Sequence, residues 1–293
     1  MGKIAILPEF VANQIAAGEV VERPASVVKE LVDNALDAGA DEIEVILESG
    51  GIDRIEVRDN GEGMSLDDLK MSVARHGTSK IKTIEDLQRI VSMGFRGEAL
   101  ASISSVSKLT LRSKREEDTT GNQIEVSNGK VGESTIVGMP RGTVIIVKEL
   151  FESVPARKKF LKTPATELRQ IIRLINHLSL AWPQIEFKLI NNGREMLNYN
   201  KRVNLEDRVI DVIGKEIASQ SFKGIYDHAH WKIEGQVGKP QTGSEKGSEQ
   251  FLIVNKRPVS DRMVMGAVKN AMGSLLPPRY QVPWVMWITM PAE

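Results

Sequence analysis

A helical apolar stripe, followed by a strand that runs into an acidic, glycine-rich turn, restricts the folds open to this chain. The stripe predicts a helix over residues 24–38, which a proline begins and a glycine follows. Strand-like segments come next at 42–47 and 52–58, and the second alternates apolar and charged residues like a strand with one wet face. The turn after it is Asp59-Asn-Gly-Glu-Gly63. This order indicates a mixed α+β fold.

Composition narrows the class of protein. The 293 residues contain no cysteine, which excludes disulfides, thiolate metal sites and a cysteine nucleophile and is typical of a reducing compartment. Lysine plus arginine equals aspartate plus glutamate at 39 each, so any DNA contact must come from a local basic patch. Neither a signal peptide nor a membrane-spanning apolar run is recognisable. We therefore expect a soluble cytoplasmic protein with no membrane partner.

The rest of the pattern predicts two domains, an α+β sandwich over residues 1–203 and a smaller α/β domain over 204–293. Asn192-Gly193 between two strand-like segments predicts a hairpin. A helix over 261–276 has apolar residues at helical spacing, and we expect these to lie in the core: Met263, Ala267, Met272 and Leu275. The other predicted elements are helical segments over 66–93, helices at 98–104 and from 164 to Pro183, and strands at 108–112, 123–126, 143–147, 185–190, 195–199, 231–237, 251–255 and 284–290.

Glu30 and Asn34 lie four residues apart on the first predicted helix, close enough to address one ligand. The carboxylate can take a proton from water. The amide oxygen can bind Mg²⁺, a hard cation that prefers oxygen ligands beside substrate phosphates. Taken alone, such a pair is more often part of a solvated polar helix face, so its interpretation depends on the motifs that accompany it.

Four further motifs carry potential nucleotide chemistry, although each also has an ordinary interpretation as a turn or loop. A carboxylate at a strand end, as at Asp59, can accept the adenine amino hydrogen while the glycines that follow let the backbone approach the base. Gly94-Phe-Arg-Gly-Glu-Ala-Leu100 runs into a helix, whose first N–H groups attract anions. Thr78-Ser-Lys80 adds two hydroxyls and an ammonium, and Gly142-Thr143 can offer a hydroxyl to the base. No G-x-x-x-x-G-K-[ST] sequence is present, so another fold must hold any nucleotide.

In combination these motifs resemble the Bergerat-fold ATPases, which include gyrase B subunits, heat-shock chaperones, sensor histidine kinases and MutL. Longer strings select among them. The stretch Asn13-Gln-Ile-Ala-Ala-Gly-Glu-Val-Val-Glu-Arg-Pro-Ala-Ser-Val-Val-Lys-Glu-Leu31 resembles the signature of the MutL family of DNA mismatch repair proteins. A sensor kinase is disfavoured because no phospho-accepting histidine helix precedes the ATP motifs. The other matching strings, which extend the resemblance over essentially the whole chain, are Arg75-His-Gly-Thr-Ser-Lys80, residues 94–105, Pro155-Ala-Arg157, Lys159-Phe-Leu161 and Val254-Asn-Lys-Arg257.

The resemblance implies a role for each matching residue. Glu30 corresponds to the general base, Asn34 to the Mg²⁺ ligand and Asp59 to the carboxylate that reads adenine. Arg257 corresponds to a basic residue that contacts DNA phosphates, with an ordinary solvated charge as the alternative. The implied fold is a Bergerat-type α/β sandwich, a mixed sheet with helices on one face, followed by a smaller ribosomal-protein-S5-like α/β transducer domain. The implied ATP-binding residues are Asn34, Ala38, Asp59, Gly63, Met64, Thr78, Ser79, Lys80, Gly94, Phe95, Arg96, Gly97, Glu98, Ala99, Leu100 and Thr143.

The function that the resemblance implies is an ATP-dependent molecular switch of DNA mismatch repair. Binding of Mg-ATP pairs two copies around a basic DNA groove and links the mismatch-recognition protein MutS to a downstream nuclease or helicase. The family's segment Asp-Val-Asn-Val-His-Pro-x-Lys, whose lysine meets the γ-phosphate, is not among the 293 residues. We therefore expect a weak ATPase with hydrolysis impaired by about 10²–10³-fold. The alternative is a nucleotide-insensitive DNA-binding or interaction module of the same fold.

Overall fold

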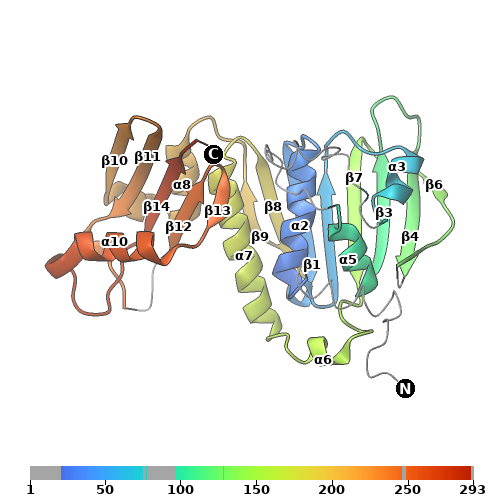
Figure 1. The fold of residues 1–293 in the computed structure, drawn as a ribbon, viewed down its shortest axis with the longest axis horizontal. Coiled ribbons are helices and arrows are strands. Elements are labelled where there is room, and N and C mark those ends of the chain that lie inside the picture. The colour runs from blue at the N-terminus through green and yellow to red at the C-terminus, as the bar shows by residue number, and fades with distance from the viewer. Residues whose placement is uncertain (1–20, 75–76, 78–96, 128, 246–248, 292–293) are drawn as a thin grey trace, which may run out of the picture. The chain divides into compact units, whose positions relative to one another are not determined.

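The computed structural model describes residues 21–74, 77, 97–127, 129–245 and 249–291. The chain forms two units, one made of residues 1–174 and 186–198 and the other of 175–185 and 199–293. The architecture is α+β, with a large mixed sheet in the first unit and a smaller α/β second unit (Figure 1). Over the residues placed by the structure, no helix combines the length and the apolar content needed to cross a membrane.

A nine-stranded mixed sheet forms the first unit. Eight strands follow the order β5-β4-β3-β7-β2-β1-β8-β9, and β6 pairs with β4 beside this path. The β1–β8 pair is parallel, whereas β1–β2, β2–β7 and β3–β7 are antiparallel. The strands are β1 (Glu42–Glu48), β2 (Arg54–Asp59), β3 (Lys108–Lys114), β4 (Gly121–Ser127), β5 (Lys130–Val131), β6 (Thr135–Val137), β7 (Gly142–Lys148), β8 (Glu186–Asn191) and β9 (Arg194–Tyr199).

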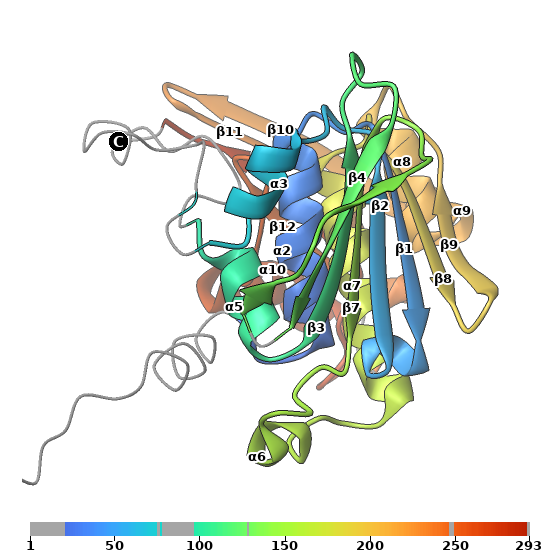
Figure 2. The ribbon, with the colours of Figure 1, turned by 90° about the vertical axis from the view of Figure 1, so that its right-hand side faces the viewer.

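Three helices lie on the same face of this sheet, namely α2 (Pro24–Asp37), α3 (Leu66–Met71) and α5 (Ala99–Ser105) (Figures 1 and 2). A 3-10 turn, η1 (Ser49–Gly51), joins β1 to β2, and the short helix α6 (Pro155–Lys158) follows β7. The mixed sheet with helices on one face is therefore the fold that the sequence predicts.

The packing of α2 shows how the sequence produces this layer. Pro24 begins the helix and Gly39, with φ of +70°, follows its end, as proline and glycine commonly do. On β1 the residues Ile43, Val45 and Leu47 alternate with more exposed ones and are buried. A buried apolar stripe on α2 completes this core, and its members are Val27, Val28, Leu31, Val32 and Ala35.

A five-stranded sheet with the order β10-β11-β14-β12-β13 forms the second unit. Its buried cluster joins the sheet to two helices and to the end of α7 (Pro164–Ala181), and contains Leu180, Ala181, Val209, Ile213, Ala218, Phe251, Ile253 and Val285. The other elements are α8 (Leu205–Ile213), α9 (Lys215–Ser219), β10 (Ser221–His228), β11 (Trp231–Gly238), η2 (Pro240–Thr242), β12 (Gln250–Val254), β13 (Arg257–Val259), α10 (Arg262–Met272), η3 (Gly273–Leu275) and β14 (Trp284–Thr289).

Arg208 of α8 is fully buried and ties three backbone segments of the second unit together. Its Nη2 donates hydrogen bonds to the carbonyl oxygens of Pro183, Ile185 and Asn200 at 2.8, 2.9 and 2.8 Å. The guanidinium carbon also lies 5.3 Å from the centroid of the Tyr199 ring. The arginine thereby joins three backbone segments, and the Pro183 carbonyl also accepts the N–H of Arg202 at 2.8 Å.

The structure confirms the predicted helix near 24–38 and the predicted hairpin, whose Asn192 and Gly193 have φ of +50° and +74° as a tight hairpin turn requires. It adds strand β10 and helices α8 and α9, which the sequence pattern did not predict. The predicted core position of the apolar residues on α10 is wrong for all but Met272. Met263 is 81% exposed, and Ala267 and Leu275 are exposed too, because none of the elements that the structure describes covers that side of the helix.

Candidate functional site

Helix α2 carries two polar side chains one turn apart. Glu30 and Asn34 are both half-buried. The Nζ atom of Lys29 lies 3.7 Å from Glu30 Oε1 and 2.7 Å from Asp33 Oδ2. Burial lowers the pKa of the Lys29 ammonium, but the carboxylates of Asp33 and Glu30 outweigh burial, and the pKa is raised overall. A protonated lysine therefore stands beside Glu30 at neutral pH.

Asp59 is the last residue of β2 and begins the glycine-rich turn. Its Oδ1 accepts a hydrogen bond from the Gly61 N–H at 2.9 Å. Burial raises the pKa of the Asp59 carboxyl to about 6, against the opposing effect of hydrogen bonds from the backbone N–H groups of Gly61 and Thr143. The carboxylate is thus ionised at neutral pH although burial disfavours its negative charge. An additional hydrogen-bond donor, such as one from a ligand, would stabilise the ionised form.

Asp59, Thr143 and Ser113 form one row across three neighbouring strands. The register pairs Asp59 of β2 with Thr143 of β7, and Thr143 with Ser113 of β3. Ser113 is fully buried, and its Oγ lies 2.9 Å from Thr143 Oγ1. The same oxygen accepts the N–H of Met64 at 2.8 Å, which anchors the residue after Gly63. A carboxylate, a threonine hydroxyl and the end of the turn are therefore held next to one another.

The Ser113 hydroxyl decides what the Thr143 hydroxyl can offer to a ligand. A serine hydroxyl has one hydrogen, and two acceptors lie within reach of it, Gly142 O at 3.1 Å and Thr143 Oγ1 at 2.9 Å. When Ser113 donates to Gly142 O, Thr143 donates to Ser113 and presents lone pairs. When Ser113 donates to Thr143, the Thr143 hydrogen can point at a ligand. Thr143 can thus act as an acceptor or as a donor.

Two glycines in this region cannot be replaced without moving the backbone. Gly63 has φ of +74°, and a Cβ atom there would lie 2.1 Å from the carbonyl oxygen of Lys114. Gly142 has φ of +119°, and its Cβ atom would lie 2.0 Å from the carbonyl oxygen of Asp59. Both positions favour glycine on conformational grounds as well. Backbone therefore packs closely on backbone at both places, against Asp59 at Gly142 and against Lys114 at Gly63.

The end of α2 meets the turn that follows Asp59. Ala38, the C-cap residue of α2, accepts the N–H of Glu62 at 3.0 Å through its carbonyl oxygen. The Asn60 side chain joins the start of the turn to the beginning of β1, the neighbouring strand in the sheet. Its Oδ1 accepts the N–H groups of Asp41 and Glu42 at 3.0 and 3.1 Å. The helix that carries Glu30 and Asn34 is thereby fixed to the turn that carries Gly63.

The predicted glycine-rich loop is described only in part. Gly97 has φ of +60° and precedes α5, where Leu100 is buried and the Glu98 carbonyl accepts the Ser102 N–H at 2.8 Å. Ala99 is the first residue of α5. The other residues predicted to cover the phosphates lie outside the described part of the chain: Thr78, Ser79, Lys80, Gly94, Phe95 and Arg96.

Arg257 belongs to the second unit, where it begins β13. A tight turn precedes it, with φ of +47° at Asn255 and +63° at Lys256, and Arg257 pairs with Val254 across this turn. Its side chain is exposed. The turn carries two cationic residues in succession, Lys256 and Arg257. The Nζ of Lys256 lies 4.9 Å from the centroid of the Trp182 ring.

Ser113 and Arg141 contribute to the first-unit site without having been predicted. Arg141 Nε donates a hydrogen bond to Gly61 O at 3.0 Å, which supports the turn from the side of β7. Neither residue stands in a local pattern that indicates nucleotide chemistry. Only the strand order β3-β7-β2 brings them to Asp59, and this order is a long-range property of the fold.

The described residues contain no group of three or more histidine, cysteine, aspartate or glutamate side chains that could hold a metal ion on their own. The Asn34 side chain on α2 offers a single amide oxygen, a donor of the kind that hard cations accept. That donor set suits Mg²⁺, which keeps waters and phosphate oxygens in its coordination shell.

Comparison with known protein families finds two matches. Residues 22–149 match the family described as histidine kinase-, DNA gyrase B- and HSP90-like ATPase. Residues 209–293 match the C-terminal domain of DNA mismatch repair proteins. The first match contains Glu30, Asn34, Asp59 and Thr143, and the second contains Arg257.

Individual relatives agree with these families. DNA mismatch repair protein MutL of Neisseria meningitidis serogroup C is 41% identical over 293 residues, which is 100% of this chain and 44% of the relative. MutL of Xanthomonas oryzae pv. oryzae is 43% identical over 285 residues, 97% of this chain and 46% of the relative. The chain thus spans less than half the length of these curated relatives.

Solved structures extend the comparison to three dimensions. The Aquifex aeolicus MutL ATPase domain complexed with ADP has a TM-score of 0.71 and 31% identity, with 94% of each chain covered. The N-terminal domain of a DNA repair protein has a TM-score of 0.80 at 24% identity, covering 98% of this chain and 89% of the other. The second likeness concerns the fold alone.

Proposed function

The chain belongs to the MutL family of DNA mismatch repair proteins, and from that premise we propose that its first unit binds and hydrolyses Mg-ATP as a nucleotide-dependent switch. The observation that carries this proposal is the row of Asp59, Thr143 and Ser113 beside the turn at Gly63. The likeness to an ATPase domain solved with ADP supports it. In a switch of this kind the lifetime of the bound state carries the signal, so rapid turnover is not required.

Recognition of adenine rests on Asp59 and its neighbours. The ionised carboxylate accepts the hydrogen of the adenine amino group, which offsets the desolvation that raises its pKa to about 6. The Thr143 hydroxyl can donate to or accept from the base edge, depending on where Ser113 directs its hydrogen. Gly142 lets its strand pack directly against the backbone of Asp59, and Gly63 lets the turn pack against the backbone of Lys114. Together these groups favour adenine over a purine that lacks the amino group.

The phosphate end of the site is assigned to α2. Asn34 would hold Mg²⁺ through its amide oxygen, and the cation when bound neutralises charge on the phosphates. Glu30, one turn earlier, accepts a proton from the attacking water. Lys29 lies 3.7 Å from Glu30 and adds positive potential there. The residues proposed to cover the phosphates are Thr78, Ser79, Lys80 and the loop from Gly94 to Leu100.

The role proposed for the whole protein is argued by analogy with the family. We propose that nucleotide binding pairs two copies and connects a mismatch-recognition partner of the MutS type to a downstream nuclease or helicase. Arg257 is proposed to contact DNA phosphates from an exposed turn of the second unit. With 39 basic and 39 acidic residues, DNA affinity would depend on this local patch and would fall steeply with salt.

The test is calorimetric binding of a non-hydrolysable ATP analogue with and without Mg²⁺. We expect Mg²⁺ to strengthen binding of the analogue to the parent chain. Asn34→Ala should lower the affinity measured with Mg²⁺ by roughly 10- to 100-fold. Asn198→Ala, at an exposed position on β9, is the matched control and should behave like the parent. Glu30→Ala should bind the analogue but not hydrolyse ATP.

Three results would count against the proposal. Absence of binding by a folded parent chain would remove the nucleotide site and leave a nucleotide-insensitive module. Equal Mg²⁺ dependence in the parent and Asn34→Ala would remove the metal assignment. Undiminished hydrolysis by Glu30→Ala would move the general base to another residue.

A further inference from the structure

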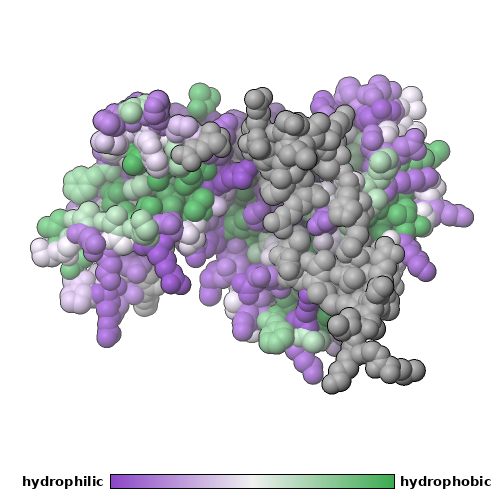
Figure 3. All heavy atoms as spheres, viewed as in Figure 1, coloured by the Kyte–Doolittle hydropathy of each residue, from purple (hydrophilic) through white to green (hydrophobic). Residues whose placement is uncertain are grey.

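Helix α10 in the second unit is well formed but poorly covered. Asp261 caps its start, since Oδ1 accepts the N–H groups of Met263 and Val264 at 2.9 Å each. Of its residues only Met272 is buried, and Met263 is 81% exposed. On the face drawn in Figure 3, apolar residues gather around α10 and the strands next to it. Few apolar side chains of α10 are therefore packed against the rest of the second unit.

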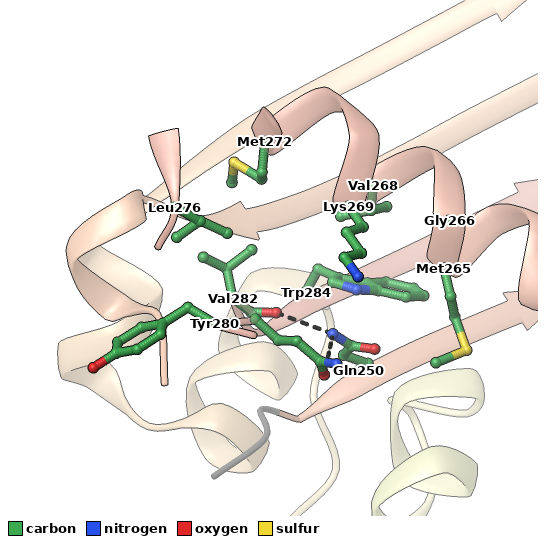
Figure 4. Close-up of a pocket in the computed structure, with 11 residues that line it drawn as sticks. Gln250, Met265, Gly266, Val268, Lys269, Met272, Leu276, Tyr280, Val282 and Trp284 are labelled. Carbon is green, nitrogen blue, oxygen red and sulfur yellow. Dashed lines mark hydrogen bonds between the residues drawn. The ribbon is translucent and has the colours of Figure 1, made fainter. Parts of the chain in front are cut away.

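A cavity of about 150 Å³ lies between α10 and the sheet (Figure 4). A space of that size with mainly apolar walls can hold a benzene-sized molecule. The strand side of the cavity is formed by Trp284 and Val282, and the helix side by Met265, Val268 and Met272, with Leu276 at one end. The cavity is therefore suited to one aromatic ring or a branched aliphatic group.

The wall contains one buried donor that has no acceptor. Trp284 is 2% exposed, and its Nε1 atom has no hydrogen-bond partner among the residues that the structure describes. Gln250, which also lines the cavity, does not accept from this nitrogen, and its own Nε2 donates to Gln281 Oε1 at 3.3 Å and to Val282 O at 3.4 Å. Buried donors are nearly always paired, so the orphaned indole N–H calls for an acceptor supplied from within the cavity.

The charge on the cavity lining selects the kind of acceptor. Lys269 of α10 is the single charged residue among those that line the cavity, and none of them is acidic. Figure 4 shows its side chain running from the helix toward the Trp284 ring. An anionic acceptor can therefore receive the indole hydrogen and approach the lysine ammonium together.

We propose that this cavity is a binding site for a small aromatic or branched aliphatic carboxylate. The apolar body occupies the space between α10 and the sheet, and the carboxylate accepts from Trp284 Nε1 and pairs with Lys269. The same chemistry occurs in a free acid such as phenylacetate and in the C-terminal phenylalanine of a peptide. The site lies wholly within the second unit, so it is independent of the nucleotide proposal.

The test is a titration followed by the indole N–H signals of the four tryptophans in ¹H–¹⁵N spectra. Phenylacetate should shift one signal saturably, and that signal should be the one missing from Trp284→Phe. Lys269→Gln should weaken phenylacetate roughly fivefold, the upper range for an exposed ion pair, and leave phenylacetamide unchanged. Val268→Phe should fill the cavity and abolish the response. Val264→Phe, on the same helix but not lining the cavity, is the matched control.

A second arm separates the two sources. A peptide ending in phenylalanine that binds more tightly than phenylacetate, and loses this advantage when amidated, supports the site and assigns it to the end of a partner chain. The proposal is overturned if the Trp284 signal does not move while the spectrum shows a folded protein. It is also overturned if Lys269→Gln, an exposed change that does not endanger folding, weakens phenylacetate and phenylacetamide equally.

Discussion

Replacing Asp59 by asparagine should stabilise the unliganded first unit at neutral pH. The carboxyl has its pKa raised from 3.8 to about 6 by burial. Between these two values the folded state holds a proton that the unfolded state has released, so the free energy of unfolding falls as pH rises through this window. At about 1.4 kcal/mol per pH unit, the cost above pH 6 amounts to about 3 kcal/mol. Asparagine has no charge to desolvate, and its amide oxygen can still accept the Gly61 N–H.

The assay is chemical unfolding of Asp59→Asn and the parent at pH 7.5 and pH 4.5. All four tryptophans, at positions 182, 231, 284 and 287, belong to the second unit. Tryptophan fluorescence therefore follows the second unit alone, while far-UV circular dichroism follows both units, and the part of its transition that fluorescence does not share reports the first unit. We expect Asp59→Asn to gain about 1–3 kcal/mol at pH 7.5 and much less at pH 4.5, with the fluorescence transition little changed.

Glu62→Gln is the matched control, because it removes the same charge from an exposed position in the same turn. It should change stability little at either pH. The reasoning would be refuted if Asp59→Asn were less stable than the parent at pH 7.5, or if its gain were as large at pH 4.5. Either result would mean that the ionised carboxylate is well solvated or otherwise paired in the folded protein.

Three further outcomes are expected. Nucleotide affinity should be about tenfold weaker at pH 5 than at pH 7.5, because with a pKa of about 6 only about a tenth of Asp59 is ionised there; calorimetry showing a flat pH profile would contradict this. Ser113→Ala should cost about 1–3 kcal/mol by removing the acceptor of the Met64 N–H, whereas Ser127→Ala, exposed on β4, should be nearly neutral in urea unfolding. Arg208→Met should destabilise the second unit by about 3 kcal/mol, since the carbonyls of Ile185 and Asn200 lose the hydrogen bonds from Arg208 and Pro183 keeps only that from Arg202; an unshifted tryptophan fluorescence transition would show that these bonds do not stabilise the unit.

Local patterns in the sequence were sufficient to predict many elements of the fold. The apolar stripe of α2 and the glycine after it predicted a helix whose end lies one residue from the observed end. Asn192-Gly193 gave the hairpin because only a few residues tolerate two successive positive φ angles. Such features depend on neighbours in the chain, so the sequence carries them directly.

Features that depend on strand order could not be predicted. Ser113 and Thr143 are thirty residues apart in the chain, and no local signal indicates that β3, β7 and β2 are neighbours. The methionines of α10 show another limit. Helical spacing indicates that a helix has an apolar face, but not whether any element covers that face, and Met263 proved to be exposed.

The most direct test of the central claim compares ATP with purine riboside triphosphate, which lacks the amino group, in the parent and in Asp59→Ala. A hydrogen bond to a charged acceptor should make ATP about 10- to 100-fold the tighter ligand of the parent. In Asp59→Ala this preference should collapse to nearly equal affinities, the signature of a direct coupling between the two groups. If the two proteins showed the same preference, Asp59 would not be the residue that reads the base, and the account of this site would be wrong.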